Sequence, residues 1–284
     1  MCKIDHWYGR FKKVVGMSKY FITSDVHGFF NELMVTLNSK EFDVNNSDHK
    51  LIVLGDLFDR GPDNIKVYEF VKSLGDRFIY VRGNHEDLLG DCVREIVSGR
   101  EVSEHHWHNR TVDTIAEFTQ MNTNVFRGFV RWESVNQTTW EVMKPILDWI
   151  DEKSVDCYEL DDNVFVHGWI PSSFRENWTK ENWQRARWYN GMEMWKDGFC
   201  LEDKIIWCGH WCCSYGWSRI RQKYKEFPPK NRKEWEKSFQ PFADDGIIAL
   251  DSCVSYSGFL NCVVYDEENK TVCLYCKELK KFPK

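Results

Sequence analysis

Short apolar runs recur along the chain, and polar or glycine-containing residues directly follow each of them. This pattern predicts buried strands whose carboxyl ends open into loops. The runs are YFIT (20–23), LIVL (51–54), FIYV (78–81), VFVH (164–167), IIWC (205–208) and IIAL (247–250).

The first three runs are separated by segments with helical spacing. Phe30, Leu33 and Leu37 share one helical face, and a similar face recurs over residues 65–74. The opening third is therefore predicted to be βαβαβ, with parallel strands and right-handed crossovers. In such a sheet the loops that bind ligands gather at the carboxyl ends of the strands. From about residue 246, renewed strand patterning predicts a β-meander that closes the domain.

Residues 87–160 differ from this pattern because they are rich in charge, Trp and His. Helical spacing over residues 112–118 and 140–147 predicts a helical insertion or cap, and Pro145 should start or kink a helix. We expect one domain over residues 19–284, preceded by an N-terminal extension at residues 1–18.

Composition and charge exclude several classes of protein. The formal net charge of −6 over 284 residues gives no broad basic surface, so we expect no nucleic-acid partner. No apolar run is long enough for a membrane span or a secretory signal, which favours a cytoplasmic protein with no membrane partner. The eleven cysteines should be mostly reduced, with Cys273 and Cys276 in an ordinary strand. The fourteen tryptophans should mostly build core.

Residues with metal-binding or catalytic chemistry follow five of the predicted strands. The first loop holds an Asp and a His two positions apart, the second two carboxylates and an arginine, and the third an Asn-His pair, while single histidines end two later strands. One DxH motif alone is weak evidence, but the ordered set is specific. These residues are Asp25 and His27; Asp56, Asp59 and Arg60; Asn84 and His85; His167; and His210.

The ordered motifs DxHG, GDxxDRG, GNHE, HG and GH resemble those of the calcineurin-like metallophosphoesterases. Within them, the chain is most similar to the group of serine/threonine protein phosphatases and diadenosine tetraphosphatases. The resemblance covers roughly residues 19–265. It implies a two-sheet α/β/β/α sandwich with a helical insertion.

The resemblance also implies a dinuclear metal site. Asp25 and His27 would hold one ion and Asn84, His167 and His210 the other, with Asp56 bridging both. Two divalent ions are expected, with Mn²⁺ first and Fe or Zn²⁺ as alternatives. A hydroxide bridging two such ions would attack the phosphorus in line.

Further roles carry over from the resemblance. His85, oriented by Asp59, would be the general acid, and Arg60 would bind a phosphate oxygen. Arg187 would complete the phosphate clamp, with Arg185 as its competitor. Tyr256 would border the substrate or belong to the core.

Other polar residues are better explained without catalysis. Arg82 should pair with a nearby carboxylate, and the histidines at 105, 106 and 108 should form a solvated surface. Two departures from the family pattern suggest a reshaped pocket: HGW in place of HGG at residues 167–169, and WHNRTVDT (107–114) in place of an NGG sequence.

The leading functional hypothesis is hydrolysis of phosphate monoesters, in particular phosphoserine or phosphothreonine in proteins. It rests on GNHE, because diadenosine tetraphosphatases usually carry GNHD. The alternative is a hydrolase of dinucleoside polyphosphates, favoured by the compact chain and the ALDSCVSYSG segment (249–258). A non-catalytic binding protein should have lost metal ligands, and none is lost. The expected partner is a phosphorylated protein or nucleotide substrate, with no obligate protein partner.

Overall fold

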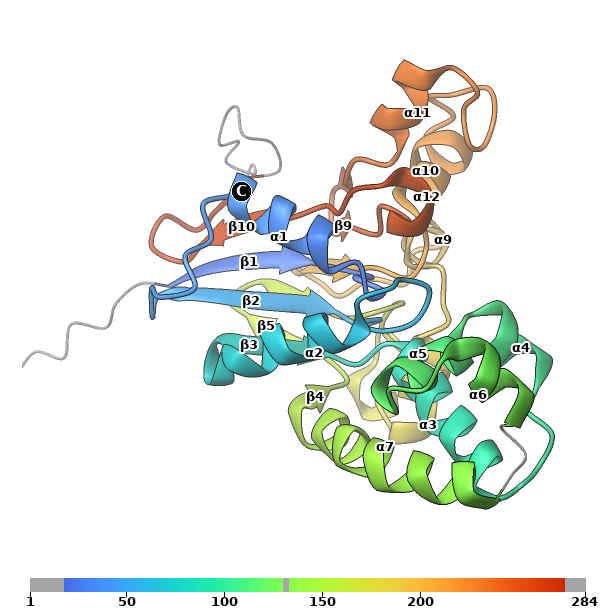
Figure 1. The fold of residues 1–284 in the computed structure, drawn as a ribbon. Coiled ribbons are helices and arrows are strands. Elements are labelled where there is room, and N and C mark those ends of the chain that lie inside the picture. Colours follow the sequence, from blue (N-terminus) through green and yellow to red (C-terminus); the bar gives the residue numbers. More distant parts are fainter. Residues whose placement is uncertain (1–17, 130–132, 274–284) are drawn as a thin grey trace, which may run out of the picture.

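The computed structural model describes residues 18–129 and 133–273 of the chain. Two β-sheets lie face to face in it, with helices on both outer faces (Figure 1). The first sheet has the strand order β11-β10-β1-β2-β3-β4 and the second has the order β5-β6-β7-β9-β8. The expected N-terminal extension lies outside the described residues, apart from Ser18.

The strands of the first sheet are β1 (Lys19–Thr23), β2 (His49–Leu54), β3 (Phe78–Val81), β4 (Ser154–Val155), β10 (Val263–Asp266) and β11 (Thr271–Cys273). Those of the second are β5 (Tyr158–Leu160), β6 (Asn163–Phe165), β7 (Ile205–Cys208), β8 (Phe242–Asp244) and β9 (Ile247–Ala249). All six apolar runs predicted as strands therefore overlap one.

The helices before β4 are α1 (Phe30–Ser39), α2 (Asn64–Ser73), α3 (Asn84–Val97), α4 (Glu104–His108), α5 (Thr111–Phe118), α6 (Thr123–Phe129) and α7 (Glu133–Lys153). Later helices are α8 (Lys180–Ala186), α9 (Gly191–Lys196), α10 (Cys213–Tyr215), α11 (Arg232–Ser238) and α12 (Val254–Ser257). Short turns of other helical types are η1 (Gly75–Arg77), η2 (Arg175–Asn177) and η3 (Gly216–Ile220).

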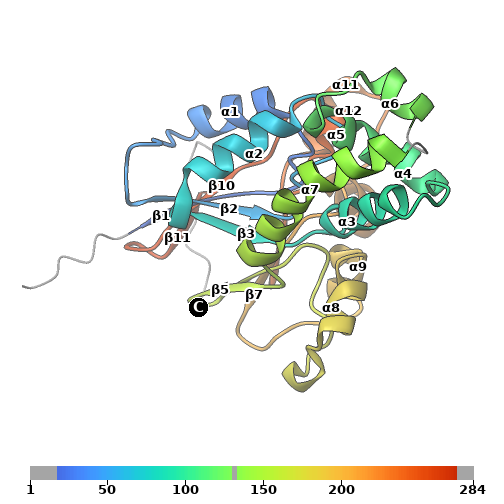
Figure 2. The same cartoon turned by 60° about the horizontal axis from the view of Figure 1, so that its bottom comes forward.

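Alternation along β1 shows how the layers are built. Tyr20 and Ile22 point into a core between the two sheets, where they meet Phe165 and Trp207 of the second sheet. Phe21, on the opposite face of the strand, belongs to the core beneath the helices. Figure 2 shows α1 and α2 along this outer face.

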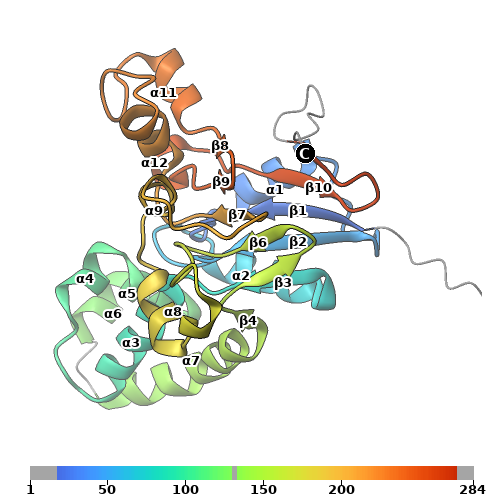
Figure 3. The same cartoon turned by 180° about the vertical axis from the view of Figure 1, so that it is seen from behind.

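The opening βαβαβ unit is present as predicted. β1 pairs with β2 in parallel, and β2 pairs with β3 in parallel. Together with the second sheet and its outer helices (Figure 3), this confirms the predicted two-sheet α/β/β/α architecture.

Residues 87–160 contain most of α3 and all of α4 to α7, and they end in β4 and β5. Their apolar side chains, such as Ile115 and Met143, share one core with the first sheet. This region is therefore packed as a layer of the domain. α7 continues across Pro145, where the sequence predicted a start or a kink.

Of the expected closing β-meander, only the hairpin of β10 and β11 is present, and β9 does not continue it. β9 belongs to the second sheet, whereas β10 and β11 form an antiparallel hairpin on the first. The chain crosses between the sheets through α12, and an apolar pattern does not reveal which sheet a strand joins. None of the helices in the described part of the chain has the length and apolar character needed to cross a lipid bilayer.

Candidate metal centre

The loops that follow β1 and β2 are joined by backbone hydrogen bonds. The amide of Asp25 donates to Gly55 O at 3.3 Å, and the amide of His27 donates to Asp56 O at 2.9 Å. Asp25, His27 and Asp56 all have positive φ angles, of 51°, 50° and 55°. Such angles are costly for residues with a side chain, and they cluster where function requires a particular geometry.

Asp56 lies at the centre of the candidate site. Its Oδ2 atom is 3.7 Å from His27 Nε2 and 4.0 Å from His85 Nε2, and its Oδ1 atom is 3.3 Å from His167 Nε2. The donor atoms form two groups that share Asp56, one with His27 and His85 and the other with His167 and His210. Within each group they lie within 4.8 Å of one another.

The orientation of two histidines suits metal binding. His27 Nδ1 lies 2.9 Å from Phe58 O, and His167 Nδ1 lies 2.6 Å from Leu54 O. A carbonyl can only accept, so each Nδ1 is the protonated nitrogen and each Nε2 carries the free lone pair. This is the arrangement that fixes imidazole as a ligand.

The electrostatics of the site also suit cations. Burial alone would raise the pKa of Asp56, but the neighbouring histidines, His167 first, outweigh it and hold that pKa well below its usual range. Burial and then Arg60 lower the pKa of His27, while burial and then His167 lower that of His210 to about 3. A buried carboxylate beside several imidazole nitrogens is a donor set that fits divalent metal ions.

Asn84 and Asp25 occupy different places around these groups. Asn84 Oδ1 lies 2.8 Å from His167 Nε2, beside the second group. The carboxylate of Asp25 accepts a hydrogen bond from Ser24 Oγ. The backbone amide of His210 also donates to it and lies 3.2 Å from Oδ1 and 3.0 Å from Oδ2. Asp25 is thus buried against the backbone of His210, next to both groups, and its role as a metal ligand stays a prediction.

His85 and Asp59 form a buried pair. His85 Nδ1 lies 2.7 Å from Asp59 Oδ2, and the hydroxyls of Thr111 and Thr114 donate to Asp59 at 2.9 Å and 2.7 Å. Burial lowers the pKa of His85, but Asp56 and Asp59 outweigh it and raise that pKa. Sequence reasoning missed both threonines, although it marked their segment, WHNRTVDT, as a departure from the family pattern.

Glu86 joins the second and third loops. Its buried carboxylate accepts backbone amides from Asp56 at 3.0 Å, Leu57 at 2.9 Å and Gly83 at 2.7 Å. A Cβ atom at Gly83 would lie 2.1 Å from Asp56 Oδ1, so only glycine permits this approach. No pattern in the sequence indicates this role of Glu86.

Arg60 reaches two of the histidines. Its terminal nitrogens lie 3.0 Å from His27 Nε2 and 3.1 Å from His85 Nε2. The guanidinium of Arg60 thus lies between the two imidazoles. Arg110 donates to the backbone carbonyl of Arg60 at 2.7 Å, which further ties the start of α5 to this loop.

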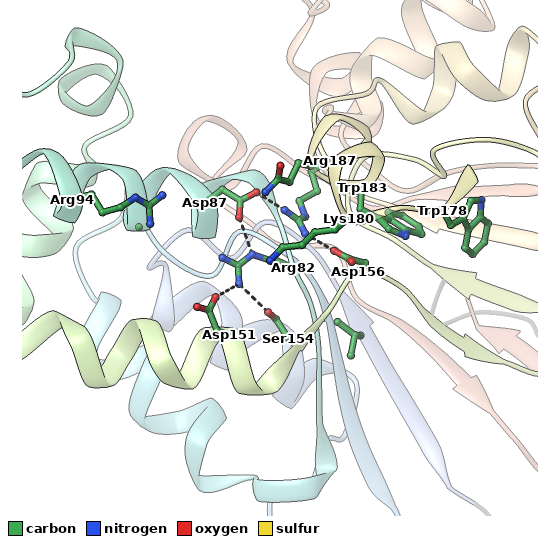
Figure 4. Close-up of a pocket in the computed structure, with 13 residues that line it drawn as sticks. Arg82, Asp87, Arg94, Asp151, Ser154, Asp156, Trp178, Lys180, Trp183 and Arg187 are labelled. Carbon is green, nitrogen blue, oxygen red and sulfur yellow. Dashed lines mark hydrogen bonds and ion pairs between the residues drawn. The ribbon is translucent and has the colours of Figure 1, made fainter. Parts of the chain in front are cut away.

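Arg187 lies in a separate, strongly charged cavity of about 700 Å³. Figure 4 shows its guanidinium between Asp87 and Asp156, with which its two terminal nitrogens pair. Arg82 lies in the same cavity and pairs with Asp87 and Asp151, at 2.8 Å and 2.7 Å, as its structural interpretation predicted. Arg185, by contrast, is exposed.

The burial of three other residues bears on the sequence-based predictions. Tyr256 is 57% exposed and packs on Trp235 and Phe239, so it is not a core residue. Asp251, which the sequence did not single out, is buried and helps to raise the pKa of Asp25, after burial itself. His106 is fully buried, so the expected solvated surface at residues 105–108 is wrong for that histidine.

The family model of the calcineurin-like phosphoesterases matches residues 18–241 of the chain. The chain belongs to this family. The predicted resemblance to this family is thereby confirmed. Membership implies divalent metal ions, and the two donor groups around Asp56 are where the described residues could hold them.

Shorter stretches of the chain are similar to curated enzymes. It is 50% identical over 87 residues to a symmetrical bis(5'-nucleosyl)-tetraphosphatase of Buchnera aphidicola subsp. Baizongia pistaciae, a match covering 31% of this chain and 30% of that one. It is 48% identical over 75 residues to the enzyme of the same name from Proteus mirabilis, covering 26% of each chain. The matches thus span less than a third of these relatives.

Solved structures support the fold alone. A cold-active protein-tyrosine phosphatase of a Shewanella species superposes with a TM-score of 0.50 and 14% identity, over 90% of this chain and 77% of that one. At this identity the likeness concerns the architecture and not the substrate.

Proposed function

We propose that this protein is a dinuclear metal-dependent hydrolase of dinucleoside polyphosphates that splits a dinucleoside tetraphosphate symmetrically. The observation that carries the proposal is the 50% identity over 87 residues to a symmetrical bis(5'-nucleosyl)-tetraphosphatase. The leading hypothesis from the sequence was a protein phosphatase, and these relatives favour the alternative instead. The substrate is therefore proposed to be a nucleotide.

The candidate metal centre supports a phosphoryl-transfer mechanism. Bound divalent cations would supply Lewis acidity at the phosphate oxygens and would lower the pKa of water. Asp56 would bridge the two ions, because its two oxygens face different groups of histidines. His27 would belong to one group, and His167 and His210 to the other, with Asn84 beside His167. Mn²⁺ remains the metal that we propose.

The leaving phosphate requires a proton donor. His85 fits this role because its Nδ1 is held by Asp59 while its Nε2 faces the centre between Asp56 and Arg60. Asp59 is itself held by two threonine hydroxyls, so the imidazole keeps one orientation. We propose that Asp25, whose carboxylate lies against the backbone amide of His210, would hold one ion together with His27.

Two arginines would bind the phosphate chain. Arg60 lies at the centre already, beside two of its histidines. For the second we favour Arg185 over Arg187, because both terminal nitrogens of Arg187 are committed to carboxylates. Tyr256 remains a proposed substrate neighbour on the exposed surface of α12. A cytoplasmic location and the lack of an obligate partner remain predictions.

The test compares substrates. Purified protein with Mn²⁺ should convert diadenosine tetraphosphate to ADP alone, measured by anion-exchange chromatography, and should turn over a phosphoserine peptide much more slowly. The variants Asp56→Asn and His85→Asn should each lose activity, by about 10²- to 10⁴-fold for the general acid. Asp91→Asn, at an exposed carboxylate on α3, is the matched control. Faster turnover of the phosphopeptide, or production of AMP and ATP, would contradict the proposal.

A further inference from the structure

Two tryptophans lie beside His210 and remain open to solvent. Trp188 is 50% exposed and Trp211 is 38% exposed. Their ring centroids lie 5.8 Å and 6.5 Å from that of His210, and the indole planes are turned 86° and 74° from the imidazole plane. Most tryptophans were expected to build core, as Trp169 and Trp207 do. An exposed indole beside a metal-binding group therefore calls for a separate explanation.

Local structure fixes the backbone at both tryptophans. The amide of Trp188 donates to Arg185 O at 3.0 Å, which continues the turn at the end of α8. The amide of Trp211 donates to Gly209 O at 2.8 Å, just beyond β7. The ring of Trp211 also packs edge-on against Tyr215, with centroids 5.4 Å apart. Two separate segments thus bring an indole to the same histidine.

We propose that Trp188 and Trp211 form a stacking platform for a nucleobase of the substrate. This inference rests on the proposed function, in which the group containing His210 binds a metal ion and, through it, the phosphate chain. In a dinucleoside polyphosphate, a ribose and at least one phosphate separate each base from the reacting phosphorus. The base must then lie outside the metal centre but next to it, where the two indoles are.

The chemistry of the platform fits a base better than a peptide. An indole offers a flat apolar face, and stacking on it needs only the π-face that every nucleobase has. Arg185, one helical turn before Trp188 and exposed, adds a positive charge suited to the phosphates of the same nucleotide. A phosphopeptide bound through the same phosphate would instead present an unstacked backbone to these rings.

The decisive experiment separates the base from the phosphates. Calorimetry in the presence of Mn²⁺ would measure the binding of ADP and of inorganic pyrophosphate, which has two phosphates and no base. We expect Trp188→Leu and Trp211→Leu each to raise the Kd for ADP by roughly tenfold, within the range of base–aromatic stacking. The Kd for pyrophosphate should stay within about twofold of that of the unchanged protein. Trp140→Leu, at a 42%-exposed tryptophan on α7, is the matched control and should change neither.

Three results would overturn the platform: no binding of ADP, an unchanged Kd for ADP in the double variant, or an equal loss of ADP and pyrophosphate binding. The last would indicate damage to the metal centre. Hydrolysis of diadenosine tetraphosphate is measured separately on the same proteins. If it proceeds with a KM that the double variant does not change, the proposed function stands and the platform fails. If ADP binding depends on both indoles but the tetraphosphate is not split, the platform stands and the proposed function fails.

Discussion

At the scale of single residues, Asp59 shows how an orientation is secured. Its carboxylate receives His85 and the hydroxyls of two threonines on α5, and all four residues are buried. A carboxylate with these partners has little freedom to rotate. The threonines therefore act on the reaction only through Asp59 and His85, as positioning residues.

This arrangement predicts the effect of Thr114→Val, which keeps the shape of the side chain and removes its hydroxyl. We expect kcat for diadenosine tetraphosphate to fall about tenfold, a fraction of the general-acid contribution, with little change in KM. Thr119→Val, whose hydroxyl bonds only backbone carbonyls at the end of α5, should leave kcat unchanged. If Thr114→Val lowers kcat equally when His85 is already Asn, the effect does not pass through His85.

Arg185 and Arg187 allow a second prediction, because they differ in partners and exposure. Arg187→Met should lower the free energy of unfolding by about 1–3 kcal/mol, since it leaves Asp156 and Asp87 short of a partner at a partly screened site. Arg185→Met should leave stability unchanged and raise KM for the tetraphosphate. Urea unfolding and steady-state kinetics on both variants test this assignment. If Arg187→Met instead raised KM and Arg185→Met lowered stability, Arg187 would be the arginine that binds the substrate.

At the scale of elements, the short helix α4 places the side chain of His106 in the interior of the protein. The ring nitrogens of His106 have no hydrogen-bond partner among the described residues, and Glu95 lies 3.7 Å from Nε2. Burial and then His105 lower the pKa of His106. The sequence placed this histidine on a solvated surface because a run of polar residues does not show that one of them faces inward.

The lowered pKa predicts a pH dependence of stability. The unfolded chain binds the proton of His106 more readily than the folded chain does, so His106 makes the protein less stable as pH falls below about 6.5. His106→Leu should therefore lose less of its unfolding free energy between pH 7.5 and pH 5 than the unchanged protein. Urea midpoints at the two pH values measure this, with the exposed His108→Gln as control. Equal losses in all three proteins would contradict the prediction.

The elements themselves were largely predictable from the sequence, and the contacts between them were not. The runs that became β1, β2, β3 and β7 carry a local apolar pattern, and the motifs after them locate the site. The pairing of Arg187 with Asp87 and the bonds from α5 to Asp59 join residues 100 and more than 50 positions apart. No periodicity records such contacts, so the sequence could not reveal them.

At the scale of the whole molecule, the candidate metal centre joins both sheets. Asp56 follows β2 of the first sheet, whereas His167 and His210 follow β6 and β7 of the second. The convergence of these loops was predictable from the sequence, because the loops that follow buried parallel strands lie at the same edge of a sheet. The placement of β9 in the second sheet and of β10 in the first was not predictable in this way.

A centre built across two sheets predicts a large effect of metal on stability. Mn²⁺ at 100 times its Kd should add about 2.7 kcal/mol to the free energy of unfolding, because only the folded chain brings the ligands together. A metal chelator should reverse the gain in Tm, as measured by calorimetry. In Asp56→Asn the gain should be mostly lost, whereas in Asp91→Asn it should remain. An equal gain in both variants would mean that Mn²⁺ binds elsewhere.

The three amide bonds to Glu86 also bear on how relatives of this protein should be compared. The carboxylate of Glu86 is buried and accepts backbone amides from two loops, so it does not face solvent. An aspartate here, one methylene shorter, would call for a different spacing of those loops and not for a different reactant. The last letter of GNHE is thus a trait of architecture, and sorting family members by it would group them by loop spacing whatever they hydrolyse.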